Sequence, residues 1–255
     1  SLVNTARPRP ARTPAEQLFA LGRIRLATDA IHTVRPLEVA IPKGRLTAVT
    51  GVSGSGKTTL VLESLVPALE ALVQGRKIPG HVRAIEADGI GQVKLIDATP
   101  IGVNVRSTVA TYADVHDELR KIFARTPDAK KAGYKAGDFS YNTGRLRCPV
   151  CDGTGTVSLD VQFLPDVDIP CPECRGARYA AAARSVRCRT EDGEYSLPEL
   201  MAMDVSAARK VCRGMKLVSG RLRVLEELGL GYLRLGEATP GLSGGEAQRL
   251  KLASE

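Results

Sequence analysis

The stretch Gly51-Val-Ser-Gly-Ser-Gly-Lys-Thr58 matches the pattern G-x-x-x-x-G-K-[ST] in full. The apolar segment Leu46–Thr50 before it predicts a buried strand, and apolar residues at helical spacing over Thr58–Leu72 predict a helix after it. Glycines let such a loop curl so that successive N–H groups face phosphate oxygens, and the helix start adds its positive dipole end. The stretch therefore predicts a nucleotide-phosphate loop in an α/β protein.

Most of the expected contacts with the nucleotide come from residues of this loop. Lys57 would neutralise the β- and γ-phosphate oxygens, and the Thr58 hydroxyl would coordinate Mg²⁺. A Gly/Ser loop can match the pattern by chance, but the flanking strand and helix disfavour that interpretation. Pro67 is expected to kink or end the following helix near Val66. The residues expected to bind ATP are Gly51, Ser53, Gly54, Ser55, Gly56, Lys57, Thr58 and Thr59.

A second anion site is predicted near the end of the chain, where Ser243 can cap a final helix. A Ser-Gly-Gly run at a helix start offers free N–H groups, a hydroxyl and little side-chain bulk. Alone, this run fits a simple capped helix equally well, but the phosphate loop upstream favours the signature sequence of an ABC-type ATPase. The predicted signature residues are Leu242, Ser243, Gly244, Gly245, Glu246 and Gln248.

A large insertion separates the two anion sites, because Lys57 and Ser243 lie 186 residues apart. The insertion contains four cysteines in the pattern C-x2-C-x19-C-x2-C, and two such knuckles predict a closed tetrahedral Zn²⁺ site with a structural role. Two disulfides or free redox thiols are the alternatives. The predicted zinc ligands are Cys148, Cys151, Cys171 and Cys174, whereas Cys188 and Cys212 are expected to be buried apolar residues.

Composition sets broad limits on the class of protein. The chain has 255 residues, a net charge of +8 and 43% hydrophobic residues, which is an ordinary globular balance with a weak indication of a polyanionic partner. No apolar run is long enough for a membrane span, and no export signal is evident at the start. We therefore expect a cytoplasmic protein without a membrane partner.

Together, the phosphate loop, the four-cysteine insertion and the Leu-Ser-Gly-Gly-Glu-Ala-Gln-Arg signature resemble the C-terminal half of the UvrA family, the damage-recognition subunits of bacterial nucleotide excision repair. The resemblance runs from about residue 30 to residue 255. Further similar segments, in the same order, are Asp97–Gly102, Ala110–Tyr112, Phe139–Asn142, Phe163–Val167 and Tyr232–Gly236.

The resemblance implies an ATPase coupled to binding of double-stranded DNA. It also implies a second ABC half in the same chain, a homodimer, and a UvrB-type partner held by the other half. The resulting candidates for DNA contacts, which would otherwise be a solvated basic face, are Arg106, Lys130, Lys131, Arg145 and Arg147.

The sequence departs from the family pattern at three positions, of which Thr58 in place of the commoner Ser is harmless because both residues carry the hydroxyl. Ala98 stands where the family has a glutamine that senses Mg²⁺ and the attacking water, and Asp138 stands where a basic residue is common. The acidic segment with the catalytic Glu is expected beyond Glu255, so residues 1–255 alone should bind ATP weakly and hardly hydrolyse it. The alternative functions are a UvrA-like resistance paralogue and the ATPase subunit of a transporter.

The expected architecture is a partial ABC-type ATPase core with a helical signature domain that carries a Cys₄ zinc ribbon. Residues 1–16 form a linker, 17–97 the ATP-binding core, 98–240 the signature and insertion domain with the ribbon at 148–176, and 241–255 the signature helix. Strands are expected at Arg23–Leu26, Pro36–Ile41 and Val93–Ile96, a helix at Tyr112–Ala124, extended arms at Val157–Phe163 and Val167–Ile169, and helical structure over Leu197–Leu228.

Overall fold

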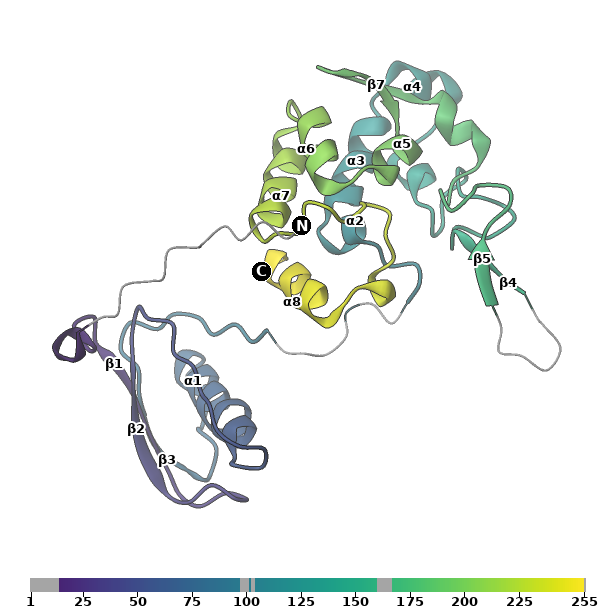
Figure 1. Cartoon of the computed structure of the whole chain (residues 1–255). Helices are drawn as coiled ribbons and strands as arrows, with labels where there is room; N and C mark the ends of the chain where they lie inside the picture. Colours follow the sequence, from purple (N-terminus) through teal and green to yellow (C-terminus); the bar gives the residue numbers. More distant parts are fainter. Residues whose placement is uncertain (1–13, 97–100, 102–103, 160–166, 255) are drawn as a thin grey trace, which may run out of the picture. The chain divides into compact units, whose positions relative to one another are not determined.

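The computed structural model describes residues 14–96, 101, 104–159 and 167–254 of the chain (Figure 1). The chain divides into two compact units, Ser1–Leu95 and Ile96–Glu255. The first unit holds the phosphate loop, and the second holds the four cysteines and the signature sequence.

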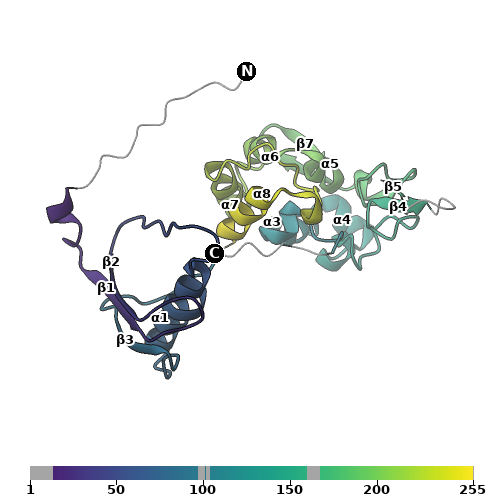
Figure 2. The ribbon, with the colours of Figure 1, turned by 60° about the horizontal axis from the view of Figure 1, so that its bottom comes forward.

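A three-stranded antiparallel sheet forms the first unit, with the order β2-β1-β3. Strands β1 (Arg23–Thr28) and β2 (Leu37–Pro42) confirm the first two expected strands, whereas β3 (Val82–Glu86) lacks a clear alternation and was not expected. Leu26 pairs with Val39 on one side and with Ile85 on the other. Helix α1 (Val66–Val73) lies against the sheet, as Figures 1 and 2 show, and its Ala68 packs with Leu26 and Val82 in a small core.

The expected strands at Leu46–Thr50 and Val93–Ile96 are wrong, because both segments are irregular. Leu46 and Val49 are exposed instead of buried. A buried parallel strand needs hydrogen-bonded neighbours on both sides. Within the described part of the first unit, the paired strands are β1, β2 and β3 alone, and neither segment joins them.

The helix that follows the phosphate loop does not end at Pro67. It is π-helical over Thr59–Leu65 and continues as α1 to Val73. Pro67 lies where the winding changes and, without an N–H, cannot donate to the preceding turn. The expected disturbance near Val66 is therefore a change of winding and not a break.

Helices packed around one hydrophobic core dominate the second unit (Figures 1 and 2). The expected helix at 112–124 is present, although Asp114, in a left-handed conformation, precedes it. Ser243 caps α8 as expected. No described helix is both long and apolar enough to cross a membrane. The helices are α2 (Val109–Tyr112), α3 (Val115–Phe123), α4 (Pro127–Ala132), α5 (Leu197–Ala202), α6 (Val205–Val211), α7 (Lys216–Glu227) and α8 (Gly244–Ala253).

Two antiparallel hairpins complete the described part of the second unit. Strands β4 (Thr156–Leu159) and β5 (Val167–Pro170) lie between the two cysteine pairs, and they confirm the expected arms where the structure describes them. Residues 160–166, including most of the Phe163–Val167 segment, lie outside the described residues. The other hairpin, β6 (Arg187–Thr190) and β7 (Gly193–Ser196), leads directly into α5.

Candidate functional sites

The phosphate loop has the backbone that its glycines predict. Gly54 and Gly56 adopt φ angles of 78° and 84°, a region that disfavours other residues. A Cβ atom on Gly56 would lie 2.3 Å from Cγ2 of Val34, so only glycine fits at that position. Gly54 O also accepts a hydrogen bond of 3.2 Å from the Thr33 hydroxyl. The loop is thus anchored to the segment between β1 and β2, with its own surface exposed.

The side chains of Lys57 and Thr58 suit phosphate and metal chemistry. The Lys57 ammonium donates to the carbonyl oxygens of Gly51, at 3.0 Å, and Val52, at 2.7 Å, which holds it over the loop. Thr58 is exposed, and its hydroxyl has no hydrogen-bond partner among the described residues. The hydroxyl of Thr59, by contrast, is occupied, since it donates to Glu63 Oε1 at 3.0 Å. Thr59 can therefore contribute its backbone N–H more readily than its side chain.

A capping box shapes the signature sequence. Ser243 Oγ accepts from the N–H of Glu246, whose carboxylate in turn accepts from the N–H of Ser243 at 2.7 Å. Hydrogen bonds from the Tyr232 hydroxyl and then from Ser243 lower the pKa of Glu246. Gly244 and Gly245 are exposed, and a Cβ on either would meet nothing within 4 Å. This helix start can therefore admit an anion close to its backbone.

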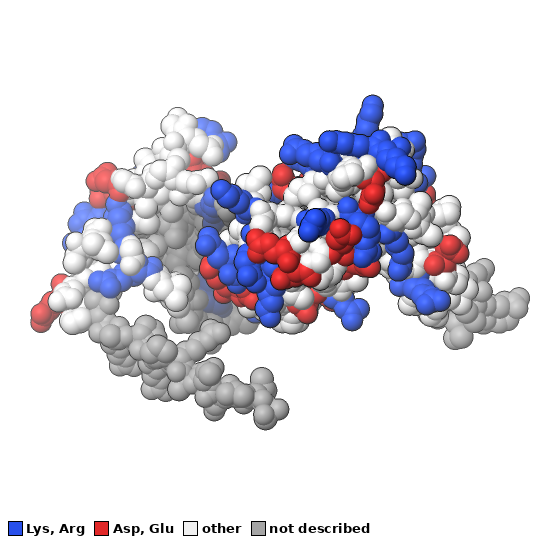
Figure 3. All heavy atoms as spheres, turned by 90° about the horizontal axis from the view of Figure 1, so that it is seen from above, with Lys and Arg blue, Asp and Glu red and all other residues white. Residues whose placement is uncertain are grey.

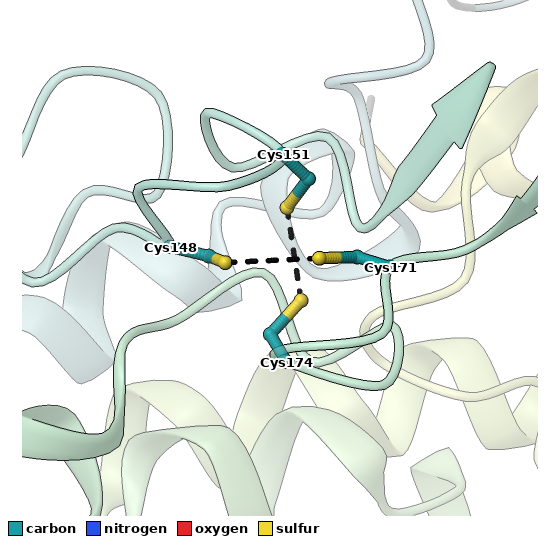
Figure 4. Close-up of side chains that lie close together, drawn as sticks. All are labelled: Cys148, Cys151, Cys171 and Cys174. Carbon is teal, nitrogen blue, oxygen red and sulfur yellow. Dashed lines mark hydrogen bonds between the residues drawn. The ribbon is translucent and has the colours of Figure 1, made fainter.

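The four predicted zinc ligands come together in the second unit. Their sulfur atoms lie within 4.8 Å of one another, and all four residues are buried (Figure 4). The Sγ atoms of Cys148 and Cys171 are 3.9 Å apart, and those of Cys151 and Cys174 are 3.7 Å apart. Sulfur atoms about 2.3 Å from a central Zn²⁺ would be separated by about 3.8 Å in a tetrahedron. Disulfides need about 2.05 Å, so this donor set fits a four-thiolate metal site and not two disulfides.

Local hydrogen bonds make one of these thiols easier to ionise than its neighbours. Burial works against ionisation of Cys151, but hydrogen bonds, chiefly from the Gly155 N–H at 3.3 Å, lower its pKa to about 7. Burial raises the pKa of Cys148, and it raises that of Cys174 to about 12. A metal that binds here would therefore displace protons from thiols whose pKa values differ widely.

The two cysteine pairs build knuckles of the same backbone shape. After Cys151, Asp152 and Gly153 have φ angles of 50° and 80°. After Cys174, Arg175 and Gly176 have φ angles of 52° and 86°. We call these the first and second knuckle, Cys148–Gly153 and Cys171–Gly176. Both place a non-glycine residue in the left-handed region, where strain is held by the surrounding structure.

Most of the residues expected to contact DNA form internal ion pairs. Arg106 and Arg147 both reach the Asp152 carboxylate, at 3.0 Å and 2.8 Å. Arg145 forms two hydrogen bonds with Asp138, at 2.7 Å and 3.1 Å, which lower the pKa of that carboxyl. The departure at Asp138 thus supplies a partner for an arginine seven residues away. Lys130 and Lys131, at the end of α4, are exposed and have no ion pair within the described residues.

A buried polar network, missed from the sequence, supports the first knuckle. Arg178 is only 6% exposed, and its Nη1 donates to the carbonyl oxygens of Val105 at 3.1 Å and Gly153 at 3.3 Å. Its guanidinium lies over the Tyr141 ring, 5.3 Å from the centroid. Burial lowers the pKa of Arg178. An arginine in a run of basic and small residues carries no sequence signal for burial, so this role emerges only from the fold.

His116 belongs to the same network. Its Nε2 lies 2.7 Å from the Tyr179 hydroxyl, which donates to the Phe139 carbonyl at 3.0 Å, and its ring lies 4.8 Å from that of Tyr141. Burial, followed by the charge of Arg120, lowers the pKa of His116 to about 3. The imidazole is therefore neutral at neutral pH.

Comparison with known proteins gives a consistent set of relatives. No protein-family model matches the chain. The chain is 43% identical over 226 residues to the UvrABC system protein A of Mycobacterium tuberculosis, covering 88% of this chain and 23% of that protein. The corresponding protein of Thermus thermophilus is 42% identical over 226 residues, again 88% of this chain and 23% of the relative. That of Synechocystis is 41% identical over 248 residues, or 95% of this chain and 25% of the relative.

One solved structure agrees with these relatives. The crystal structure of UvrA2 from Deinococcus radiodurans superimposes with a TM-score of 0.81 at 41% identity. The match covers 99% of this chain and 29% of the other. The chain therefore spans about a quarter of the length of the curated relatives it matches.

Proposed function

Because the chain belongs to the UvrA family and spans about a quarter of its curated relatives' length, we propose that it supplies part of an ATP-dependent, DNA-binding damage-recognition protein. The function of this family is in nucleotide excision repair. The observation that carries the proposal is the convergence of the four cysteine sulfur atoms within a chain that also holds a complete phosphate loop.

Nucleotide binding rests on the phosphate loop. Backbone N–H groups from Gly54 to Thr58 bind the phosphates, Lys57 neutralises them, and the Thr58 hydroxyl binds Mg²⁺. The free Thr58 hydroxyl and the close fit of Gly56 against Val34 support this assignment. The signature residues from Leu242 to Gln248 serve the γ-phosphate held by another ABC half, and the full-length protein hydrolyses ATP as a dimer.

Zinc has a structural role in this proposal. Four thiolates fill a tetrahedral shell and leave no open position for a substrate. The metal would therefore contribute folding free energy to the β4–β5 ribbon, and the cysteines would hold both knuckles in place. A transporter ATPase has no need for such a site, so the cysteine cluster disfavours that alternative.

Double-stranded DNA is the proposed substrate, and a UvrB-type protein is the proposed partner through another part of the full-length chain. Of the five basic candidates, the exposed Lys130 and Lys131 fit phosphate contacts most simply. Arg106, Arg145 and Arg147 would have to exchange a carboxylate for a phosphate. A resistance paralogue remains the second candidate, favoured by Ala98, which lies outside the described residues.

The full-length protein tests the nucleotide site through one pair of variants. Lys57→Ala should abolish binding of a fluorescent ATP analogue at this site, whereas Ala98→Gln should leave binding intact and keep or raise phosphate release. Lys77→Ala, which removes an exposed lysine outside the loop, is the matched control and should behave as the wild type. Normal analogue binding at this site after Lys57→Ala would show that the site is assigned wrongly.

A further inference from the structure

A cavity of about 540 Å³ lies beside the second knuckle. Three chain segments line it: the knuckle and the residues after it, the first turns of α5, and the loop that follows α7. Its apolar lining includes Ala177, Pro198 and Met201, and its charged lining consists of Arg175, Arg178, Arg184, Arg234, Glu199 and Glu237.

Three of these arginines are available to a ligand. Arg175, Arg184 and Arg234 are exposed, and none of them forms an ion pair within the described residues. Arg178 is buried and its Nη1 donates to two backbone carbonyls, so its main contribution to the cavity wall is its charge. These three arginines thus differ from Arg106 and Arg147, which are paired with Asp152 of the first knuckle.

The two carboxylates of the lining already have partners. Glu199 accepts from Arg187 at 2.8 Å and from the Ser196 N–H at 2.7 Å. Burial works against ionisation of Glu199, but the bonds from Ser196 and Arg187 together lower its pKa. Glu237 accepts from the backbone N–H of Arg234 at 3.2 Å. Because each carboxylate is engaged and the arginines outnumber them, the cavity presents a net positive charge.

The backbone holds the arginines in fixed places. Arg175 adopts a left-handed conformation, and its N–H donates to Cys171 O at 2.7 Å. The backbone of Arg234 pairs with the backbone of Asp204 in an isolated antiparallel β-bridge. Figure 3 shows Lys and Arg side chains gathered in patches on one face of the second unit, with Asp and Glu between them. The knuckle and the bridge thus fix the backbone positions of Arg175 and Arg234 at the cavity.

We propose that this cavity binds consecutive backbone phosphates of the DNA, through Arg175, Arg184 and Arg234. The inference rests on the proposed DNA-binding function and names a site for it. Guanidinium groups from three segments can each bind a different phosphate of one DNA strand. The two carboxylates already accept hydrogen bonds, so they are poorly placed to accept one from a base, and contacts with the backbone are favoured over contacts with base edges. The apolar wall then accommodates the sugars between the phosphates.

Salt-dependent binding of a fluorescein-labelled duplex to the full-length protein tests the site. Arg184→Ala and Arg234→Ala should each weaken binding several-fold at low salt and reduce the slope of log K against log salt by about 1, because each removes one phosphate contact. Arg234→Lys keeps the charge and should keep the slope. Arg189→Ala, on β6 and outside the cavity, removes an exposed, unpaired arginine and should change little. Zinc content and thermal melting check that each variant is folded.

The outcomes separate the two levels of the argument. A wild-type protein that does not bind duplex at low salt overturns the proposed function and this inference with it. If the wild type binds but Arg184→Ala and Arg234→Ala match it, or match Arg189→Ala, the cavity is not the site. An equal reduction of the slope of log K against log salt in Arg234→Lys and Arg234→Ala would also overturn the proposed phosphate site.

Discussion

The two cysteine knuckles share a backbone shape and differ in almost everything around it. In the first, Asp152 binds two arginines, and a Cβ on Gly153 would lie 1.7 Å from Tyr141 O. In the second, Arg175 has no ion pair among the described residues, and a Cβ on Gly176 would meet nothing within 4 Å. The two C-x2-C pairs thus share one turn, but the surroundings of that turn differ.

The difference gives each knuckle a separate task. The first attaches the ribbon to the helical core, through Asp152 and through the Gly153 carbonyl that accepts from Arg178. The second leaves its outer side free and lines the arginine cavity. Four predictions test this division, in order of decreasing effect.

Removing one cysteine of the cluster should abolish the difference between the knuckles, because the proposed metal would be held by both of them. Cys148→Ser in the first knuckle and Cys171→Ser in the second should each reduce bound zinc from about one equivalent to nearly none. Both should lower the melting temperature of the second unit to a similar extent, since the metal supplies folding free energy. Cys212→Ser, at a buried cysteine outside the cluster, is the control and should retain zinc. A Cys171→Ser protein with full zinc content would contradict the four-thiolate site.

Alanine in place of the knuckle glycines should separate the two environments. Both substitutions place a Cβ at positive φ, which costs on the order of 1 kcal/mol. Gly153→Ala must also displace the Tyr141 carbonyl, so its total should reach about 3 kcal/mol or more. Urea unfolding of the two variants measures the difference. Equal costs would mean that the first knuckle is not held against Tyr141.

Acid should weaken the support of the first knuckle. His116 has a pKa of about 3 in the fold, below the value of about 6.5 expected in an unfolded chain. Its neutral form therefore contributes stability that is complete above about pH 6.5 and is lost as pH falls toward 3, by about 1.4 kcal/mol per unit.

Unfolding of His116→Phe measured between pH 7 and pH 4.5 should show a shallower dependence than the wild type. The exposed His32 offers a control, since His32→Phe should keep the wild-type slope for the second unit. Identical slopes in wild type and His116→Phe would exclude this histidine as the titrating group.

Asp152→Asn should have the smallest effect of the four changes. It should raise the affinity for DNA, whereas loss of a cavity arginine should lower it. Asparagine tolerates the left-handed backbone, and the change leaves Arg106 and Arg147 without a carboxylate partner. Affinity for duplex DNA at low salt should rise a few-fold, with a steeper salt dependence. Asp138→Asn, which releases only Arg145, should give a smaller gain. A weaker affinity in Asp152→Asn would mean that Asp152 positions the arginines and does not compete with phosphate.

Local chemistry was predictable from the sequence, and long-range pairing was not. Each C-x2-C pair and the Ser243 cap lie within a few residues, and the clustering of the four cysteines and the cap were both confirmed. The expected strand at Leu46–Thr50 was wrong because a buried strand needs paired neighbours, and no strand among the described residues pairs with this segment. The ion pairs of Arg106 and Arg147 depend on the left-handed Asp152, which no periodicity shows. The four-cysteine cluster could therefore be located from sequence, but not the arginine cavity beside it.

The unequal cores of the two units have a thermodynamic consequence. Within the described residues, the main cluster of the first unit contains only Leu26, Ala68 and Val82 as buried members, whereas that of the second contains thirty. Burial of so few side chains provides only a few kcal/mol before conformational entropy is subtracted. Calorimetry of residues 1–255 should therefore show two transitions instead of one. The first unit, which holds the phosphate loop, should unfold first, while the β4–β5 ribbon and α8 persist to a higher temperature.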